Sequence, residues 1–148
     1  ASHFEHYEIS NYCKSGYKAI HNSNYWKAFP YLGIGPAAHS FNGDIRKWNI
    51  NSLEKYSENV QNDDVYYEIE TLDTDMKYNE YIMLGLRTNN GIDFDEIENK
   101  YGKIYATHTF ATKKNINKSL IMRNDNILSL NEKGLLLADR IASNFFVL

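Results

Sequence analysis

The chain has 148 residues, enough for one ordinary domain or for a small domain with part of another. Hydrophobic residues make up 43% of it and aromatic residues 14%, a composition typical of a folded protein and unlike a disordered one. With 16 basic and 19 acidic residues the net charge is −3, which disfavours a general binder of nucleic-acid backbones. A local basic patch stays compatible with that charge.

Cysteine content and hydropathy indicate the cellular setting. Cys13 is the single cysteine, so no disulfide can form within the chain, and a reducing compartment is the simplest interpretation. No apolar run approaches the roughly 18 residues that a membrane-spanning helix needs, and no signal-like segment opens the sequence. We therefore expect a cytoplasmic protein without an integral membrane segment.

The first region, up to residue 64, is rich in aromatic residues, glycine and asparagine, and we expect short strands there. Strand-favouring residues occur in three segments, at residues 6–12, 31–35 and 45–50. A helical turn is expected near Trp26, and Asn51 or Ser52 is placed to cap a helix through Val60. Because the strands are far apart in sequence, we expect a parallel sheet with crossovers.

The polar residues 61–64 predict a joint, and helical periodicity follows it. Helices are expected over residues 73–87, over 94–100 with Asp93 as the cap, within 105–118, and after the cap Asn131. Residues 120–123 and 127–130 predict a hairpin whose turn is 124–126. The final helix repeats apolar residues at helical spacing: Leu135, Ala138, Ile141, Ala142 and Phe145. The order predicts a winged-helix-like module over residues 65–148.

Three segments of the first region carry residues suited to chemistry. Residues 7–11 form a strand that ends in small polar side chains, which can equally satisfy their own turn. In the second segment His21 can ligate haem iron or shuttle protons, and Tyr25 and Trp26 can stack on a flat macrocycle. A histidine beside aromatic residues is, however, more often a packing element.

The third segment, residues 33–40, begins with two glycines at the expected end of a strand. Gly33 and Gly35 let the backbone approach a ligand without obstruction by side chains. It is not a dinucleotide-binding fingerprint, because the third glycine is missing and Pro36 intervenes. Taken alone, the segment is a weak indication of a binding site.

Taken in order, these segments closely resemble the oxygen-independent coproporphyrinogen III oxidase family of radical-SAM proteins, the HemN/HemW type. The resemblance lies in Tyr7-Glu8-Ile9-Ser10-Asn11, His21-Asn22-x-x-Tyr25-Trp26, Tyr31-Leu32-Gly33-Ile34-Gly35-Pro36-Ala37-Ala38-His39-Ser40, Arg46 and Asn49. It continues more loosely through residues 80–92 and 130–139. The histidine–tyrosine–tryptophan element is similar to the haem-chaperone branch of that family, which we favour over the oxidase branch.

The resemblance implies a fold and a division of the chain. Residues 1–64 would be an α/β segment, the last strands of a partial TIM-type radical-SAM barrel. Residues 65–148 would be the α+β, mainly helical and winged-helix-like C-terminal domain, which packs over the barrel mouth and covers the substrate. Such a chain would be the C-terminal part of a longer parent.

The resemblance also implies cofactors and site residues. The parent would hold S-adenosylmethionine and a 4Fe–4S cluster, with Gly33, Ile34, Gly35 and Ala37 lining the S-adenosylmethionine side of the pocket. His21, Tyr25 and Trp26 would be candidate haem contacts, with His21 a possible ligand of the haem iron. The cluster needs three cysteines, whereas this chain has only Cys13, so no catalytic residue and no cluster ligand is expected within it.

Two further functions stay open. The parent could be a genuine coproporphyrinogen III dehydrogenase, in which a 5′-deoxyadenosyl radical starts the decarboxylation of propionates of the porphyrinogen. The second region could instead be a winged-helix nucleic-acid binder that uses the basic residues 113–118. The acidic net charge and the lack of base-reading arginines disfavour the second, so we expect haem or porphyrinogen and the parent's own N-terminal half as partners, and no nucleic acid.

Overall fold

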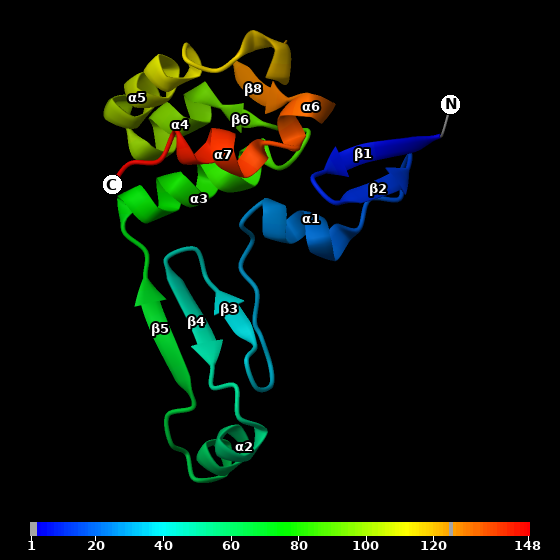
Figure 1. Cartoon of the computed structure of the whole chain (residues 1–148). Coiled ribbons are helices and arrows are strands. Elements are labelled where there is room, and N and C mark those ends of the chain that lie inside the picture. Colours follow the sequence, from blue (N-terminus) through cyan, green and yellow to red (C-terminus); the bar gives the residue numbers. More distant parts are fainter. Residues whose placement is uncertain (1–2, 125) are drawn as a thin grey trace. The chain divides into compact units, whose positions relative to one another are not determined.

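The computed structural model describes residues 3–124 and 126–148 and has mixed α/β structure, with small sheets and helices (Figure 1). Every strand pair in the described residues is antiparallel, so the predicted parallel crossover sheet is wrong. The reason is local turn chemistry. The Asn42 side chain accepts hydrogen bonds from the N–H groups of Asp44 and Ile45 and turns the chain back as a tight hairpin.

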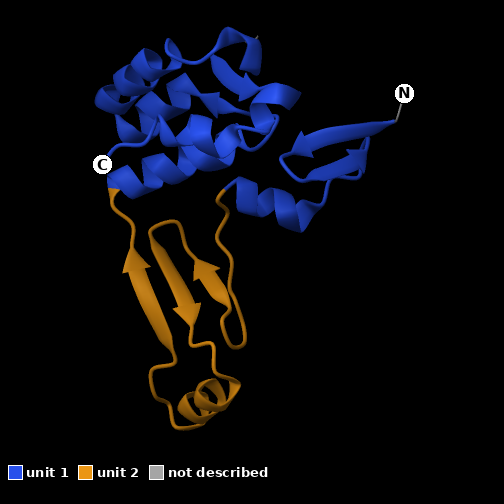
Figure 2. Cartoon of the chain, in the orientation of Figure 1, with its two compact units in different colours: residues 1–27, 74–148 blue, residues 28–73 orange. Residues whose placement is uncertain are grey.

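The chain forms two compact units, residues 1–27 with 74–148 and residues 28–73 (Figure 2). This division differs from the boundary predicted at residue 64, because β5 (Tyr67–Thr71) pairs with β4 (Ile45–Asn49) and stays with the strands before it. We call residues 1–27 with 74–148 the first unit and residues 28–73 the second unit.

The first unit begins with a hairpin where one strand was expected over residues 6–12. β1 (Phe4–Glu8) pairs with β2 (Asn11–Lys14), and the chain turns at Ile9 and Ser10. The Ile9 N–H donates to the Arg87 carbonyl at 2.8 Å, and the Asn89 N–H donates to the Tyr7 carbonyl at 3.1 Å. These bonds join the hairpin to the segment after α3, and α1 (Ile20–Trp26) follows the hairpin.

The C-terminal elements of the first unit confirm most of the predicted helices and the hairpin. In chain order they are α3 (Thr74–Leu86), β6 (Ile92–Asp93), α4 (Phe94–Tyr101), α5 (Lys103–Lys113), the 3-10 turn η1 (Lys118–Leu120), β7 (Ile121–Asn124), β8 (Ile127–Leu130), α6 (Glu132–Leu135) and α7 (Ala138–Ser143). The strands form one antiparallel sheet in the order β6-β8-β7. Asp125 of the predicted turn lies outside the described residues.

The single final helix predicted after Asn131 is two helices. Asn131 caps α6 as expected, since its side chain accepts from the N–H groups of Lys133 and Gly134. The Leu137 N–H then bonds to the Gly134 carbonyl in a tighter turn, and α7 begins anew at Ala138. A β-carbon at residue 134 would lie 2.2 Å from the Leu120 carbonyl oxygen, so the chain passes too close to η1 there for any residue but glycine.

The core of the first unit lies between α3, α4, α7 and the three-stranded sheet (Figure 1). Tyr78, Ile82 and Leu86 form the buried face of α3, and each is 0% exposed. The apolar positions predicted for the C-terminal helix are all buried: Leu135, Ala138, Ile141, Ala142 and Phe145. Helical spacing of apolar residues therefore identified these core positions correctly.

A hydroxyl pair lies within this core. Tyr78 and Thr109 are both 0% exposed, and their hydroxyl oxygens are 2.8 Å apart. Thr109 donates its own proton to the Tyr105 carbonyl at 2.7 Å, so Tyr78 is the donor to Thr109. The pair satisfies two buried polar groups and links α3 to α5.

The second unit consists of β3 (His39–Phe41), β4 and β5, with α2 (Leu53–Gln61) between β4 and β5. Ser52 caps α2, as predicted, by accepting from the Lys55 N–H. Residues 31–35 were expected as a strand, yet Tyr31 makes only an isolated bridge to Phe41. Leu72 is the one buried apolar side chain of residues 28–73, while Leu32, Ile34 and Ile69 are exposed.

Gly85 gives a test of the packing in which local propensity and tertiary contact oppose each other. Alanine favours a helix interior over glycine by about 1 kcal/mol. A β-carbon at residue 85 would lie 2.5 Å from Ile92 Cγ2 and 2.8 Å from the Gly91 carbonyl oxygen, a clash with backbone. We expect Gly85→Ala to lower the free energy of unfolding in urea by about 1–2 kcal/mol, because overpacking outweighs propensity. Thr107→Ala, at an exposed position of α5, is the control and should not lower the free energy of unfolding.

Tyr101 makes stability depend on pH in the alkaline range. Burial raises the pKa of Tyr101 from 10.0 to about 12, and the carboxylates of Glu96 and Glu80 act in the same direction. The folded state therefore holds the phenol proton more tightly, so this stability is present below about pH 10 and is lost as the pH rises through about 12. Tyr101→Phe should flatten the fall in unfolding free energy above about pH 10. Tyr17→Phe, at a side chain that is 79% exposed, should leave it unchanged.

Candidate functional site

α1 carries two of the expected haem contacts as an adjacent ring pair. His21 and Tyr25 are four residues apart and lie on the same side of the helix. Their ring centroids are 4.9 Å apart and the ring planes are 82° apart, so one edge meets the other face. Both side chains are exposed, and no residue of α1 is buried. This pair is therefore accessible to a ligand.

Trp26, the third expected haem contact, differs from that pair. Its side chain is half-buried, and its Nε1–H is buried without a hydrogen-bond partner in the described residues. An indole N–H that is removed from water usually finds an acceptor. Trp26 thus has one unused donor at the end of α1.

The glycine loop, residues 31–38, is held by side chains of the second unit. The Gly33 N–H donates to Ser40 Oγ at 3.0 Å, and the Gly35 N–H donates to the Tyr56 hydroxyl at 3.3 Å. Asn49 Nδ2 donates to the Gly35 carbonyl at 2.8 Å. The N–H groups of Gly33 and Gly35 are therefore used within the chain. The sequence offers no signal for Tyr56, because its contact with Gly35 spans 21 residues and arises from the position of α2.

Glycine occupies positions 33 and 35 of this loop for different physical reasons. A β-carbon at Gly33 would lie 2.1 Å from the His39 carbonyl oxygen, so the chain's own backbone requires glycine there. Gly35 has φ +102 and open space around its α-carbon, and the neighbouring Ile34 side chain is 83% exposed. Ala37 has a left-handed φ of 57. The part of the loop that is open to solvent, and so accessible to a ligand, is thus at Ile34 and Gly35.

The structure keeps the two candidate groups in different units. His21, Tyr25 and Trp26 lie in the first unit, and Gly33, Ile34, Gly35 and Ala37 lie in the second. In the described residues no group of three or more histidine, cysteine or acidic side chains is placed to hold a metal ion. Cys13 is buried in β2 at 7% exposure.

Three buried side-chain atoms lack a hydrogen-bond partner in the described part of the chain, and all three lie in the quoted motifs. They are Glu8 Oε1, Trp26 Nε1 and Asn49 Oδ1. Glu8 is 1% exposed, and its other oxygen accepts from the Ser10 N–H at 3.2 Å. Asn49 is 3% exposed and uses only its amide N–H2. Such orphaned buried groups are few in folded proteins.

No helix in residues 3–124 and 126–148 combines the length and the apolar character needed to cross a bilayer. The expectation that the chain has no integral membrane segment rested on the same two properties, the length and the apolar character of its segments.

Comparison with known proteins relates the chain to one group. Residues 72–137 match the model of the HemN C-terminal domain. The heme chaperone HemW of Bacillus subtilis is 28% identical over 141 residues, which are 94% of this chain and 37% of the relative. The heme chaperone HemW of Lactococcus lactis is 27% identical over 148 residues, 97% of this chain and 38% of the relative. The chain thus spans little more than a third of the length of these curated relatives.

The fold leads to the same group. The coproporphyrinogen III oxidase HemN of Escherichia coli, a radical-SAM enzyme, superposes with a TM-score of 0.72 at 16% identity, over 98% of this chain and 37% of that one. The likeness extends across both compact units, although at this identity it concerns the fold alone. The sequence matches show that this chain is a relative of the C-terminal portion of the HemN/HemW-type proteins, closer to the haem-chaperone branch, and the fold agrees with this relationship.

Proposed function

We propose that this chain is the C-terminal part of a haem-handling protein that binds haem and passes it on. The observation that carries the proposal is the match of 94% and 97% of the chain to proteins named heme chaperones. The exposed ring pair of His21 and Tyr25 supports it, because an accessible imidazole beside an aromatic ring suits a flat iron macrocycle.

His21, Tyr25 and Trp26 of α1 each have a distinct role in this proposal. An imidazole nitrogen of His21 coordinates the haem iron of the cargo. The ring of Tyr25 restricts the rotation of that imidazole and packs against the macrocycle. The half-buried ring of Trp26 is proposed to pack beside the macrocycle at the end of α1.

The parent protein would also bind S-adenosylmethionine and a 4Fe–4S cluster. Gly33, Ile34, Gly35 and Ala37 are proposed to line one side of the S-adenosylmethionine pocket, and the open space at Gly35 supports this. The cluster does not fit this chain, because one cysteine cannot replace three thiolate ligands. The N-terminal half of the parent would supply those cysteines.

We retain the division into residues 1–64 and 65–148 as a proposal about which domains of the parent protein the two ranges belong to. Residues 1–64 would complete the partial TIM-type barrel of the parent. The exposed Leu32, Ile34 and Ile69 support the view that further chain covers the second unit. Residues 65–148 would be a winged-helix-like cover over the barrel mouth, which the element order α3-β6-α4-α5-β7-β8 supports. We propose a cytoplasmic location.

The alternative is that the parent is a genuine coproporphyrinogen III dehydrogenase. The fold likeness to the Escherichia coli oxidase is the observation in its favour. In either case this chain contributes contacts to S-adenosylmethionine and to the tetrapyrrole but no cluster. The two functions differ in whether haem itself is bound.

Haem titration of the full chain tests the role of His21. We expect His21→Ala to weaken haemin binding at least about tenfold and to change the Soret band, because the iron loses its protein ligand. His3→Ala removes another exposed histidine and should bind as the unsubstituted chain does. Identical Soret spectra and affinities for both variants would remove His21 from the proposed site.

A second test concerns radical chemistry. After iron–sulfur reconstitution with S-adenosylmethionine and a reductant, we expect this chain to produce no 5′-deoxyadenosine above a protein-free blank, because three thiolates are needed to hold the cluster. Chromatography of the quenched reaction provides the measurement. Formation of 5′-deoxyadenosine at a rate proportional to chain concentration would contradict the proposal that the N-terminal half of the parent holds the cluster.

A further inference from the structure

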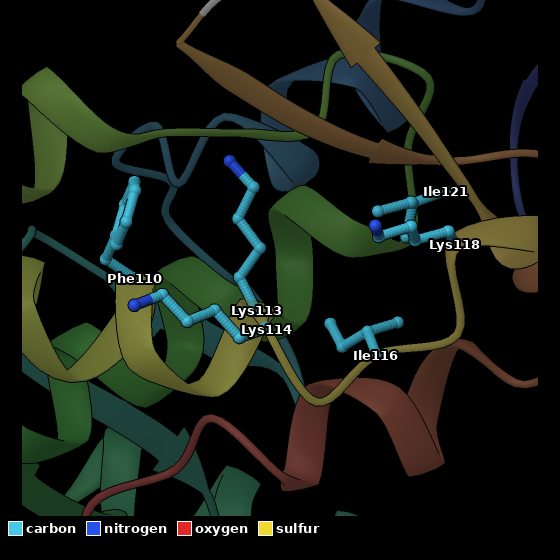
Figure 3. Close-up of a pocket in the computed structure, with 6 residues that line it drawn as sticks. All are labelled: Phe110, Lys113, Lys114, Ile116, Lys118 and Ile121. Atoms are coloured by element: carbon cyan, nitrogen blue, oxygen red, sulfur yellow. The ribbon is translucent and has the colours of Figure 1, made fainter.

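A second candidate site lies in the first unit, away from α1. It is a pocket of about 450 Å³ between the end of α5 and the start of β7 (Figure 3). Phe110, Lys113 and Lys114 come from α5, while Ile116, Lys118 and Ile121 come from the following loop, η1 and β7. A volume of this size is typical of small-molecule sites, which span about 300–1,000 Å³.

The polar part of the pocket is cationic. Of its described lining residues three are lysines, and none is acidic. Lys113 is 8% exposed, and its Nζ lies 4.2 Å from the ring centroid of Phe94, so its charge is held in place by the aromatic face. Lys114 and Lys118 are exposed at the rim. Their ammonium groups can turn toward an anion in the pocket.

The other half of the lining is apolar. Phe110 is 51% exposed, and Ile116 and Ile121 are half-buried. Figure 3 shows Ile116 and Ile121 on the side of the pocket opposite Phe110. An inorganic anion would gain nothing from such walls, because its affinity comes from charge and hydrogen bonds alone. Apolar walls next to ammonium groups suit a ligand that has both an apolar body and a negative charge.

We propose that this pocket binds an organic anion, in which a carboxylate, sulfonate or phosphate is joined to an apolar body of small-molecule size. Lys114 and Lys118 pair with the anionic group, and Phe110, Ile116 and Ile121 cover the apolar body. This assignment rests on the pocket alone and is independent of the haem-binding role of α1.

Fluorescence titration of the full chain with 8-anilino-1-naphthalenesulfonate tests the proposal. We expect one saturable site, and we expect Lys114→Gln and Lys118→Gln each to weaken binding about fivefold, the effect of one partly exposed ion pair. Added salt should weaken binding in the same direction. Lys133→Gln, at an exposed lysine of α6 outside the pocket, is the matched control and should bind unchanged. Thermal unfolding of each variant checks that the fold is kept.

Competition against the bound probe identifies the source of the anion. Displacement by laurate indicates an acyl carboxylate, and displacement by metal-free protoporphyrin indicates a tetrapyrrole carboxylate; either result supports the proposal. Metal-free protoporphyrin has no iron for His21 to ligate. Its competition with the probe therefore tests this pocket separately from the proposed haem site on α1. The proposal is overturned if neither competes, if inorganic phosphate or duplex DNA competes as well as they do, or if Lys114→Gln and Lys118→Gln bind like Lys133→Gln.

Discussion

Burial of one face of α3 is the interaction on which the first unit depends. Tyr78, Ile82 and Leu86 are removed from water entirely, and helices and strands from three other parts of the chain cover them. The Tyr78 hydroxyl, buried with them, requires an acceptor, and Thr109 supplies it from α5. The segment after α3 then receives the β1–β2 hairpin through the Arg87 carbonyl. The attachment of the hairpin that precedes α1 is therefore a consequence of the α3 core.

The second unit is organised by polar contacts more than by a core. Leu72 is its single buried apolar side chain, whereas Ser40 and Asn49 are buried polar groups that hold the glycine loop. A unit with so little buried apolar surface obtains little of its stability from burial. The glycine loop therefore keeps a defined geometry through hydrogen bonds, although the apolar residues of the second unit are exposed. In this respect the second unit differs from the first unit, which has a hydrophobic core of its own.

Local signals predicted much of the first unit and little of the second. The helices α3 and α4, the cap Asp93 and the β7–β8 hairpin follow from periodicity, capping and turn residues within a few positions. The pairing of β1 with β2 was missed, because residues 6–12 look like one continuous strand. The break between α6 and α7 was missed as well, because the tighter turn in which the Leu137 N–H bonds to the Gly134 carbonyl leaves the helical spacing of the apolar residues intact.

For the site, the sequence by itself determined which residues are candidates and to which proteins the chain is related, because motif order along the chain needs no coordinates. It singled out His21, Tyr25, Trp26 and the glycines of residues 33–40. Only the tertiary structure decided how they are presented. It made the His21–Tyr25 pair accessible, left the Trp26 N–H without an acceptor, and used the Gly33 and Gly35 N–H groups internally. Exposure and hydrogen-bond partners depend on contacts between residues far apart in the chain, and no local pattern encodes them.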